Sequence, residues 1–254
     1  MLKIFFALII FLSSLIANEK DSFFQTNYTF IDVSINYLDW NNYTQNHTIQ
    51  KDFSYLEIEG GSGWDWGEFY GFMDIENPTH SYSDTPTNDL RVTVKPIFDI
   101  YIKNGLNIHI QDFNLQSKTY HINNLIIGLS YKYSSKTLWF TPFIAPHYKT
   151  STYFTGFNGY MLGWSFNYDF EIFGEKIALF NWHEFKFNRA KDDYQLNDGT
   201  LVGNEKSYGV NGSISLWWTL NKHLKPGVQY RYAKYELGFP EYQSALIYSL
   251  KYYF

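Results

Sequence analysis

The chain has 254 residues, no cysteine and a formal net charge of −5, with 21% aromatic and only 18% charged residues. The lack of cysteine excludes disulfide frameworks, thiolate metal sites, cysteine nucleophiles and a lipoprotein anchor, and the acidic balance offers no basic patch for nucleic acid. A mean hydropathy of −0.32 argues against a helical membrane protein, whereas a β-barrel that is apolar outside and polar inside gives such an average.

Residues 1–17 are predicted to be a secretory signal peptide. Lys3 supplies a positive start, residues 4–16 are almost wholly apolar, and Ala17 and Asn18 follow. The apolar run is shorter than the roughly 20 residues of a membrane-spanning helix, and no later stretch reaches that length. We expect cleavage near Ala17, with a retained membrane anchor as the alternative. Residues 18–254 are then expected to form one all-β domain, an outer-membrane antiparallel β-barrel.

Alternation of side chains with period two predicts strands along the whole of this domain. The clearest run extends from Tyr160 to Ile172, with one face entirely apolar or aromatic and the other mostly small or charged. It exceeds the roughly 9–11 residues that a tilted membrane-crossing strand needs. In chain order, twelve such segments are predicted, at 27–38, 53–60, 64–76, 90–102, 105–113, 122–133, 137–148, 159–172, 176–187, 208–219, 224–235 and 242–254.

Three local irregularities are also predicted. The glycines in GGSGWDWG indicate a tight turn at Gly61–Gly63, flanked by tryptophans of an aromatic girdle at Trp64 and Trp66. Pro96 removes one backbone donor from its strand, which predicts a bulge. The alternation of segment 176–187 breaks at residues 182–184, which predicts another bulge.

The predicted connections alternate in length, as in outer-membrane barrels with short periplasmic turns and long external loops. The external loops are predicted at 39–52, 77–89, 114–121, 149–158, 188–207 and 236–241. Both chain ends then lie on the periplasmic side, which requires an even number of strands. A soluble β-sandwich is the alternative, but fully apolar faces on nearly every long strand disfavour it.

The polar parity of the strands is expected to line the lumen. A basic side chain facing lipid at mid-bilayer would cost roughly 2–4 kcal/mol, so this assignment is strongly constrained. The candidate residues that line the channel and bind solute are Tyr55, Glu57, Glu59, Tyr70, Phe72, Asp74, Arg91 and Lys95. Two interpretations remain open. The charged groups form a network that fills a narrow lumen, or they form, with the aromatic rings, a series of small-molecule sites in which planar bases stack.

Enzymatic interpretations are weaker. A barrel hydrolase needs a Ser–His pair within reach on the wall, and no His here is followed by Ser two positions later. His109 and His147 are predicted to be hydrogen-bonded wall residues rather than bases or metal ligands. We expect no catalytic residue, no metal and no cofactor.

The segment from Ser54 to Glu76 resembles the nucleoside-specific channel-forming outer-membrane porins, the Tsx/OmpK-like family. That family has a Tyr-Leu-Glu-x-Glu strand, a turn and a Phe-Tyr-Gly-aromatic-x-Asp strand. The matching residues here are Tyr55, Leu56, Glu57, Glu59, Phe69, Tyr70, Gly71, Phe72 and Asp74. The segments VTVKPIFDI and DVSINYLDW are similar to neighbouring strands of the family, so the resemblance covers about residues 28–101.

The resemblance implies a monomeric twelve-stranded barrel with a narrow channel for passive, selective diffusion of nucleosides or similar small solutes into the periplasm. It also implies outer-membrane lipid as surroundings and service as a phage or colicin receptor. The last strand, which ends at Phe254, resembles the signal read by the outer-membrane assembly machinery. The alternative function is a structural or adhesive barrel, or a phage receptor, with a closed lumen that acts through loops 39–52 and 188–207.

Overall fold

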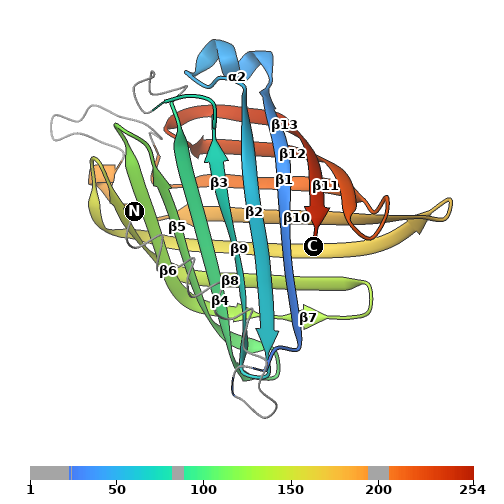
Figure 1. Cartoon of the computed structure of the whole chain (residues 1–254). Helices are drawn as coiled ribbons and strands as arrows, with labels where there is room; N and C mark the ends of the chain where they lie inside the picture. Colours follow the sequence, from blue (N-terminus) through green and yellow to red (C-terminus); the bar gives the residue numbers. More distant parts are fainter. Residues whose placement is uncertain (1–22, 24, 82–88, 194–205) are drawn as a thin grey trace.

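The structure, a computed structural model, describes residues 23, 25–81, 89–193 and 206–254. These residues form one antiparallel sheet whose ends meet, so that the sheet closes into a barrel (Figure 1). The predicted signal peptide lies outside the described residues. Within the described ranges, no helix combines the length and the apolar character needed to cross a membrane.

The strands match the segments that alternation predicts. They are β1 (Tyr28–Trp40), β2 (Phe53–Trp64), β3 (Gly67–Glu76), β4 (Arg91–Lys103), β5 (Leu106–Gln116), β6 (His121–Tyr131), β7 (Tyr133–Ser134), β8 (Leu138–Ser151), β9 (Thr155–Ile172), β10 (Glu175–Phe187), β11 (Gly209–Trp218), β12 (Leu224–Glu236) and β13 (Phe239–Tyr253). Only Lys132 separates β6 from β7, and both pair with β8. They form one interrupted strand, so the barrel has the twelve strands predicted.

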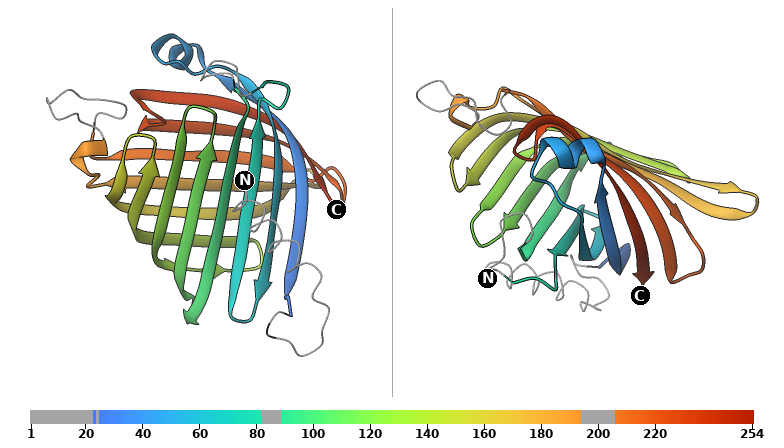
Figure 2. Two further views of the ribbon diagram at one scale, coloured as in Figure 1. Left: turned by 60° about the vertical axis from the view of Figure 1, so that its left-hand side comes forward. Right: turned by 90° about the horizontal axis from the view of Figure 1, so that it is seen from above.

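Closure of the barrel depends on two pairings. Strand β1 pairs with β13, placing Asp32 opposite Tyr253, and β6 pairs with β8, placing Leu129 opposite Ile144. Strands β1–β6 form one side of the barrel, and β8–β13 lie across it on the other side (Figures 1 and 2). A closed sheet has no free edge, as a lipid environment requires of any spanning sheet.

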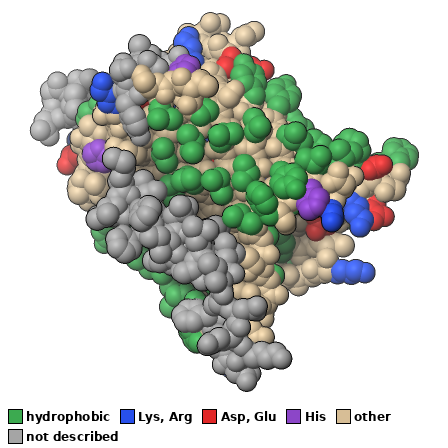
Figure 3. All heavy atoms as spheres, in the orientation of Figure 1, with side chains coloured by type: hydrophobic (Ala, Val, Ile, Leu, Met, Phe, Trp, Pro, Cys, Tyr) green, Lys and Arg blue, Asp and Glu red, His purple; other side chains and the backbone are tan. Residues whose placement is uncertain are grey.

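The two faces of the sheet differ as predicted. On β1, Ile35 and Tyr37 are 65% and 45% exposed, whereas Asp32 and Ser34 are 0% and 1% exposed. Apolar side chains therefore point outward and polar ones inward. Figure 3 shows hydrophobic side chains gathered on the visible outer face, with most visible charged side chains at its margins.

The predicted turn at Gly61–Gly63 is wrong, because these residues lie inside β2 and the turn falls at Asp65–Trp66. A Cβ atom at Gly63 would lie 2.1 Å from the ring of Tyr28 on β1, and one at Gly61 would lie 2.8 Å from the ring of Phe30. The glycines therefore make room for aromatic rings that lie across them inside the barrel.

Neither predicted bulge forms. Pro96 lies opposite Gly71 on β3, and β4 keeps one register with β5 from Val94 to Ile97. The lost donor interrupts the pairing without shifting it. Register shifts occur instead between Pro146 and Tyr148, between Tyr101 and Lys103, and between Lys234 and Glu236.

Strand β10 is continuous in register with both neighbours, so its predicted bulge is also wrong. Its alternation looked broken because two polar residues, Asn181 and His183, face outward. Both are hydrogen-bonded there: Trp164 Nε1 donates to Asn181 Oδ1 over 2.8 Å, and His183 Nδ1 lies 2.9 Å from the Tyr232 hydroxyl. Their polarity is therefore satisfied within the outer face.

The loops alternate less strongly in length than predicted. The strands extend further, which reduces loops 114–121, 149–158 and 236–241 to 117–120, 152–154 and 237–238. The loop between β1 and β2 contains a short helix, α2 (Asn42–His47), at one end of the barrel (Figure 1). At the opposite end, the turn Asn104–Gly105 has φ angles of 51° and 84°, the left-handed pair that an Asn-Gly hairpin supplies.

Candidate functional site

All eight predicted lining residues lie on the inner face of the barrel. Directly opposite residues of an antiparallel pair share a face. Ser34 faces inward and lies opposite Glu57, which lies opposite Asp74, and Phe72 lies opposite Lys95. The same ladders place the others on this face: Tyr55, Glu59, Tyr70 and Arg91.

Four carboxyl groups gather on β1–β3, and Lys251 on β13 contacts two of them; we call Asp32, Glu57, Glu59, Asp74 and Lys251 the carboxyl cluster. Lys251 is ion-paired with Glu59, and its Nζ lies 3.4 Å from Asp32 Oδ1. Glu57 accepts a hydrogen bond from Ser34 over 3.3 Å and lies directly opposite Asp74. Among the residues that the structure describes, Lys251 is thus the cation ion-paired with this concentrated negative charge.

A salt bridge crosses the lumen beside this cluster. Lys95 Nζ on β4 lies 2.7 Å from Glu184 Oε1 on β10. Gln111 Nε2 on β5 donates to the same oxygen over 2.9 Å. We call these three residues the lumen bridge. Sequence reasoning missed Glu184, because it lies where the bulge was predicted; continued alternation from Lys186 would have placed it on the inner face.

An aromatic ring lies next to the bridge. The indole of Trp182 has Lys95 Nζ 5.2 Å from its centroid and the guanidinium carbon of Arg231 also 5.2 Å from it. Arg231 interacts electrostatically with Glu184 and Asp74, and its Nη2 donates to Asn211 over 3.3 Å. Trp182 is only partly buried, so it presents an aromatic surface between two cations.

The opposite part of the lumen contains apolar side chains among hydrogen-bonded polar ones. Strands β6, β8 and β9 contribute a buried group, which we call the apolar cluster: Ile126, Phe143, Ala145 and Met161. Phe143 stacks on His109 with centroids 4.5 Å apart. His109 Nδ1 lies 2.9 Å from Asp99 Oδ1, and His147 Nε2 lies 2.9 Å from Asn124 Oδ1. The two histidines are therefore hydrogen-bonded wall residues, as expected.

At the α2 end of the barrel, two loops contact the ends of the strands. In the first, Thr44 of α2 is fully buried, and its hydroxyl accepts a hydrogen bond from Ser244 N over 3.0 Å. Asn41 Nδ2 donates to the Ser244 hydroxyl over 2.5 Å. Next to this helix, on β1 and β13, lies a buried hydrophobic cluster of Leu38, Trp40, Ala245 and Ile247. Phe53, Tyr55 and Leu237 pack against it.

The second loop is the start of segment 188–207, whose residues 194–205 are outside the described part. Lys149 Nζ lies 2.5 Å from Asp193 Oδ1, and Asn158 Nδ2 donates to Asp193 Oδ2 over 2.9 Å. Arg189 is ion-paired with Glu236. The described start of the loop is thus held against inward-facing side chains.

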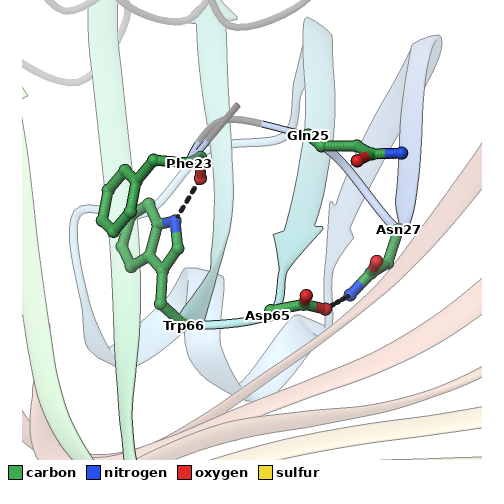
Figure 4. A pocket seen from close by; sticks show the side chains of 5 residues that line it. All are labelled: Phe23, Gln25, Asn27, Asp65 and Trp66. Carbon is green, nitrogen blue, oxygen red and sulfur yellow. Dashed lines mark hydrogen bonds between the residues drawn. The ribbon is translucent and has the colours of Figure 1, made fainter. Parts of the chain in front are cut away.

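At the opposite end, Glu68 accepts hydrogen bonds from Tyr28 over 3.1 Å and from Tyr101 over 3.2 Å, and is ion-paired with Lys132. Near the β2–β3 turn lies a cavity of about 490 Å³ lined by Phe23, Gln25, Asn27, Asp65 and Trp66 (Figure 4). The indole of Trp66 stacks on Phe23 and donates to its carbonyl over 2.8 Å. None of its five lining residues belongs to the lumen bridge or the carboxyl cluster.

In the described ranges, no three His, Asp or Glu side chains are grouped so that they could hold a metal ion. The lumen residues described above offer hydrogen-bonding groups, fixed charges and aromatic rings.

Comparison with known proteins gives a family match over most of the chain. The family model described as "Nucleoside-specific channel-forming protein, Tsx" matches residues 35–254. Among solved structures, a NanC porin is similar with a TM-score of 0.51 and 14% identity, over 87% of this chain and 98% of that chain. A KdgM porin gives a TM-score of 0.48 and 9% identity, over 88% of this chain and 99% of that chain. At this identity, the likeness to the NanC porin shows the fold alone.

Proposed function

Because the chain belongs to the nucleoside-specific channel-forming Tsx family, we propose that nucleosides pass along the charged side of its lumen, between the carboxyl cluster and Trp182. The protein is an outer-membrane β-barrel channel and not an enzyme, as the sequence predicted. What the family leaves to be proposed is the path and the residues that form it.

The observation that carries the proposal is the pairing of an aromatic surface with facing carboxyl groups. Trp182 offers a partly exposed indole on β10, with Lys95 Nζ and the guanidinium carbon of Arg231 each 5.2 Å from its centroid. Arg231 interacts electrostatically with Tyr55 of β2 and Asp74 of β3. A nucleoside joins a planar base to a sugar with hydroxyl donors. The base can stack on the indole, while carboxylates accept from the hydroxyl groups.

The eight predicted lining residues take three roles in this proposal. The rings stack the base as it moves, the carboxyl groups accept hydrogen bonds from the ribose, and the cations hold neighbouring carboxylates, Arg91 that of Glu76 and Lys95 that of Glu184. The rings are Tyr55, Tyr70 and Phe72, the carboxyl groups are Glu57, Glu59 and Asp74, and the cations are Arg91 and Lys95. Arg91 is suited to its role by a 2.5 Å ion pair with Glu76.

Single-channel recording tests the substrate. The purified barrel in a planar bilayer is expected to conduct, and adenosine is expected to reduce the current in a saturable way because it occupies the path. Glucose, which has hydroxyl groups but no planar base, serves as the matched control and is expected to leave the current almost unchanged. Equal reduction by both solutes, or by neither, contradicts a nucleoside path.

A closed barrel that acts through its outer loops is the second candidate. The lumen bridge favours it, because Lys95 and Glu184 meet across the interior. Absence of any conductance from correctly folded protein would support this candidate.

Three further features belong to the proposal. Residues 1–17 act as a cleaved signal peptide, which the mass of the mature protein tests. The outward face of β13, with Leu250 and Tyr252 exposed, is read by the outer-membrane assembly machinery, so charged substitutions there are expected to slow assembly in cells. The barrel works as a monomer, which light scattering in detergent measures.

A further inference from the structure

The lumen bridge connects strands that are far apart in the barrel. From β4 to β10, the sheet order passes through β5, β6, β8 and β9 in one direction, and through β3, β2, β1, β13, β12 and β11 in the other. The two strands therefore lie nearly opposite each other. The 2.7 Å contact between Lys95 and Glu184 runs across the interior instead of following the wall.

The bridge is closely held. The side chains of Lys95 and Glu184 are only 13% and 10% exposed, and Gln111 fixes the same carboxylate oxygen from a third strand. An ion pair with an additional hydrogen-bond donor has a defined geometry, because each group's orientation is constrained by the other two.

The apolar cluster lies on one side of the bridge. Gln111 lies directly opposite Ile126, and Glu184 lies opposite Gly163, which in turn lies opposite Phe143. A Cβ atom at Gly163 would lie 2.5 Å from the ring of Phe143, so the packing there is tight. The other side of the bridge holds Trp182 and the carboxyl cluster.

We infer that the lumen bridge sets the size limit of the channel by confining solutes to the side of the lumen between Trp182 and the carboxyl cluster. The identity of the solute rests on the proposed function. The size limit does not depend on which solute passes. A solute the width of a single base ring system passes beside the bridge, whereas a wider solute must first separate Lys95 from Glu184. The pair therefore acts as a specificity determinant.

The stability of the barrel does not require this pair, since interstrand hydrogen bonds close the sheet. Buried ion pairs add little net stability compared with uncharged replacements, although loss of one partner leaves a costly unpaired charge. Removal of both partners together is therefore the informative change.

The test compares solute exclusion in proteoliposomes that contain folded barrel. The double variant Lys95→Ala/Glu184→Ala is expected to admit larger oligosaccharides than the unaltered protein in a swelling assay with a graded series from mono- to tetrasaccharides. Its single-channel conductance is expected to rise about twofold or more, because the constriction widens. The exchange Lys95→Glu/Glu184→Lys rebuilds the bridge with the charges reversed and is expected to restore the original limit.

Lys186→Ala is the matched control, on the same face of β10. Glu236, which lies 3.1 Å from Lys186 Nζ, keeps Arg189 as its partner, so the exclusion limit is expected to stay unchanged. If the alanine pair does not fold, Lys95→Met/Glu184→Met replaces it, because flexible uncharged chains cannot form the contact. An unchanged limit in a folded double variant, or an equally raised limit in the charge exchange, overturns the inference. Failure of adenosine selectivity with a shifted sugar limit would refute only the proposed substrate.

Discussion

Replacement of Lys251 by methionine is expected to abolish or severely reduce folding of the barrel. The lysine side chain is 6% exposed, and it is ion-paired with Glu59 and lies 3.4 Å from Asp32, whose side chain is fully buried. Its loss leaves buried carboxylates without a cation, a change that costs about 3–5 kcal/mol when one partner of a buried ion pair is removed. The folded fraction, measured by heat-modifiable mobility on gels and by urea titration in lipid, reports the effect.

Lys225→Met provides the matched control. Lys225 lies directly opposite Lys251 on β12, with its Nζ 4.1 Å from the centroid of the Tyr253 ring. Because the neighbouring charge is also positive, its removal relieves repulsion and is expected to leave the folded fraction nearly unchanged. Addition of Asp32→Asn and Glu59→Gln to Lys251→Met is expected to restore folding. Equal loss of folding in both lysine variants would contradict this electrostatic explanation.

Removal of the Trp182 ring is expected to weaken nucleoside binding more than any other single change in the path. Stacking on an aromatic side chain contributes about 1–3 kcal/mol per base, which corresponds to about a 5- to 150-fold change in affinity. Trp182→Ala is therefore expected to shift the adenosine concentration that half-blocks the current by this factor. Trp182→Phe keeps a smaller stacking surface, so its half-blocking adenosine concentration is expected to lie between those of the unaltered protein and Trp182→Ala.

Trp218→Ala is the control for Trp182→Ala. Trp218 is 40% exposed on the outer face, and its indole donates to Glu175 over 2.8 Å at the turn end of β10. Because it does not face the lumen, its removal is expected to leave the adenosine block unchanged. A block that survives loss of Trp182 would remove the indole from the proposed path.

Alternation alone predicted the strand number, the faces and the closure of the barrel, because lipid outside and polar groups inside impose one pattern on every strand. Ile35 and Asp32 show how sharply the two environments differ, at 65% and 0% exposed. The same rule placed Glu57 and Lys95 on the inner face. These predictions succeeded because they depend on the parity of neighbouring residues along a strand.

Features that depend on contacts between distant strands were not predictable in this way. The partner of Lys95 on β4 is Glu184 on β10, with β5, β6, β8 and β9 between them in the sheet, and no local pattern connects them. The outward polar residues Asn181 and His183 disguised the parity of β10, because their hydrogen-bond partners lie on neighbouring strands. The glycines of β2 were mistaken for a turn for a similar reason, since the rings they accommodate belong to β1.

The rate at which labelled adenosine enters proteoliposomes, measured against its external concentration, tests the central claim most directly. If binding groups line the path between Trp182 and the carboxyl cluster, the entry rate is expected to saturate as the adenosine concentration rises. Unlabelled nucleosides are expected to compete with labelled adenosine, whereas glucose is expected not to compete. Entry that rises linearly without competition, or no entry above protein-free vesicles, would contradict a selective nucleoside path through this lumen.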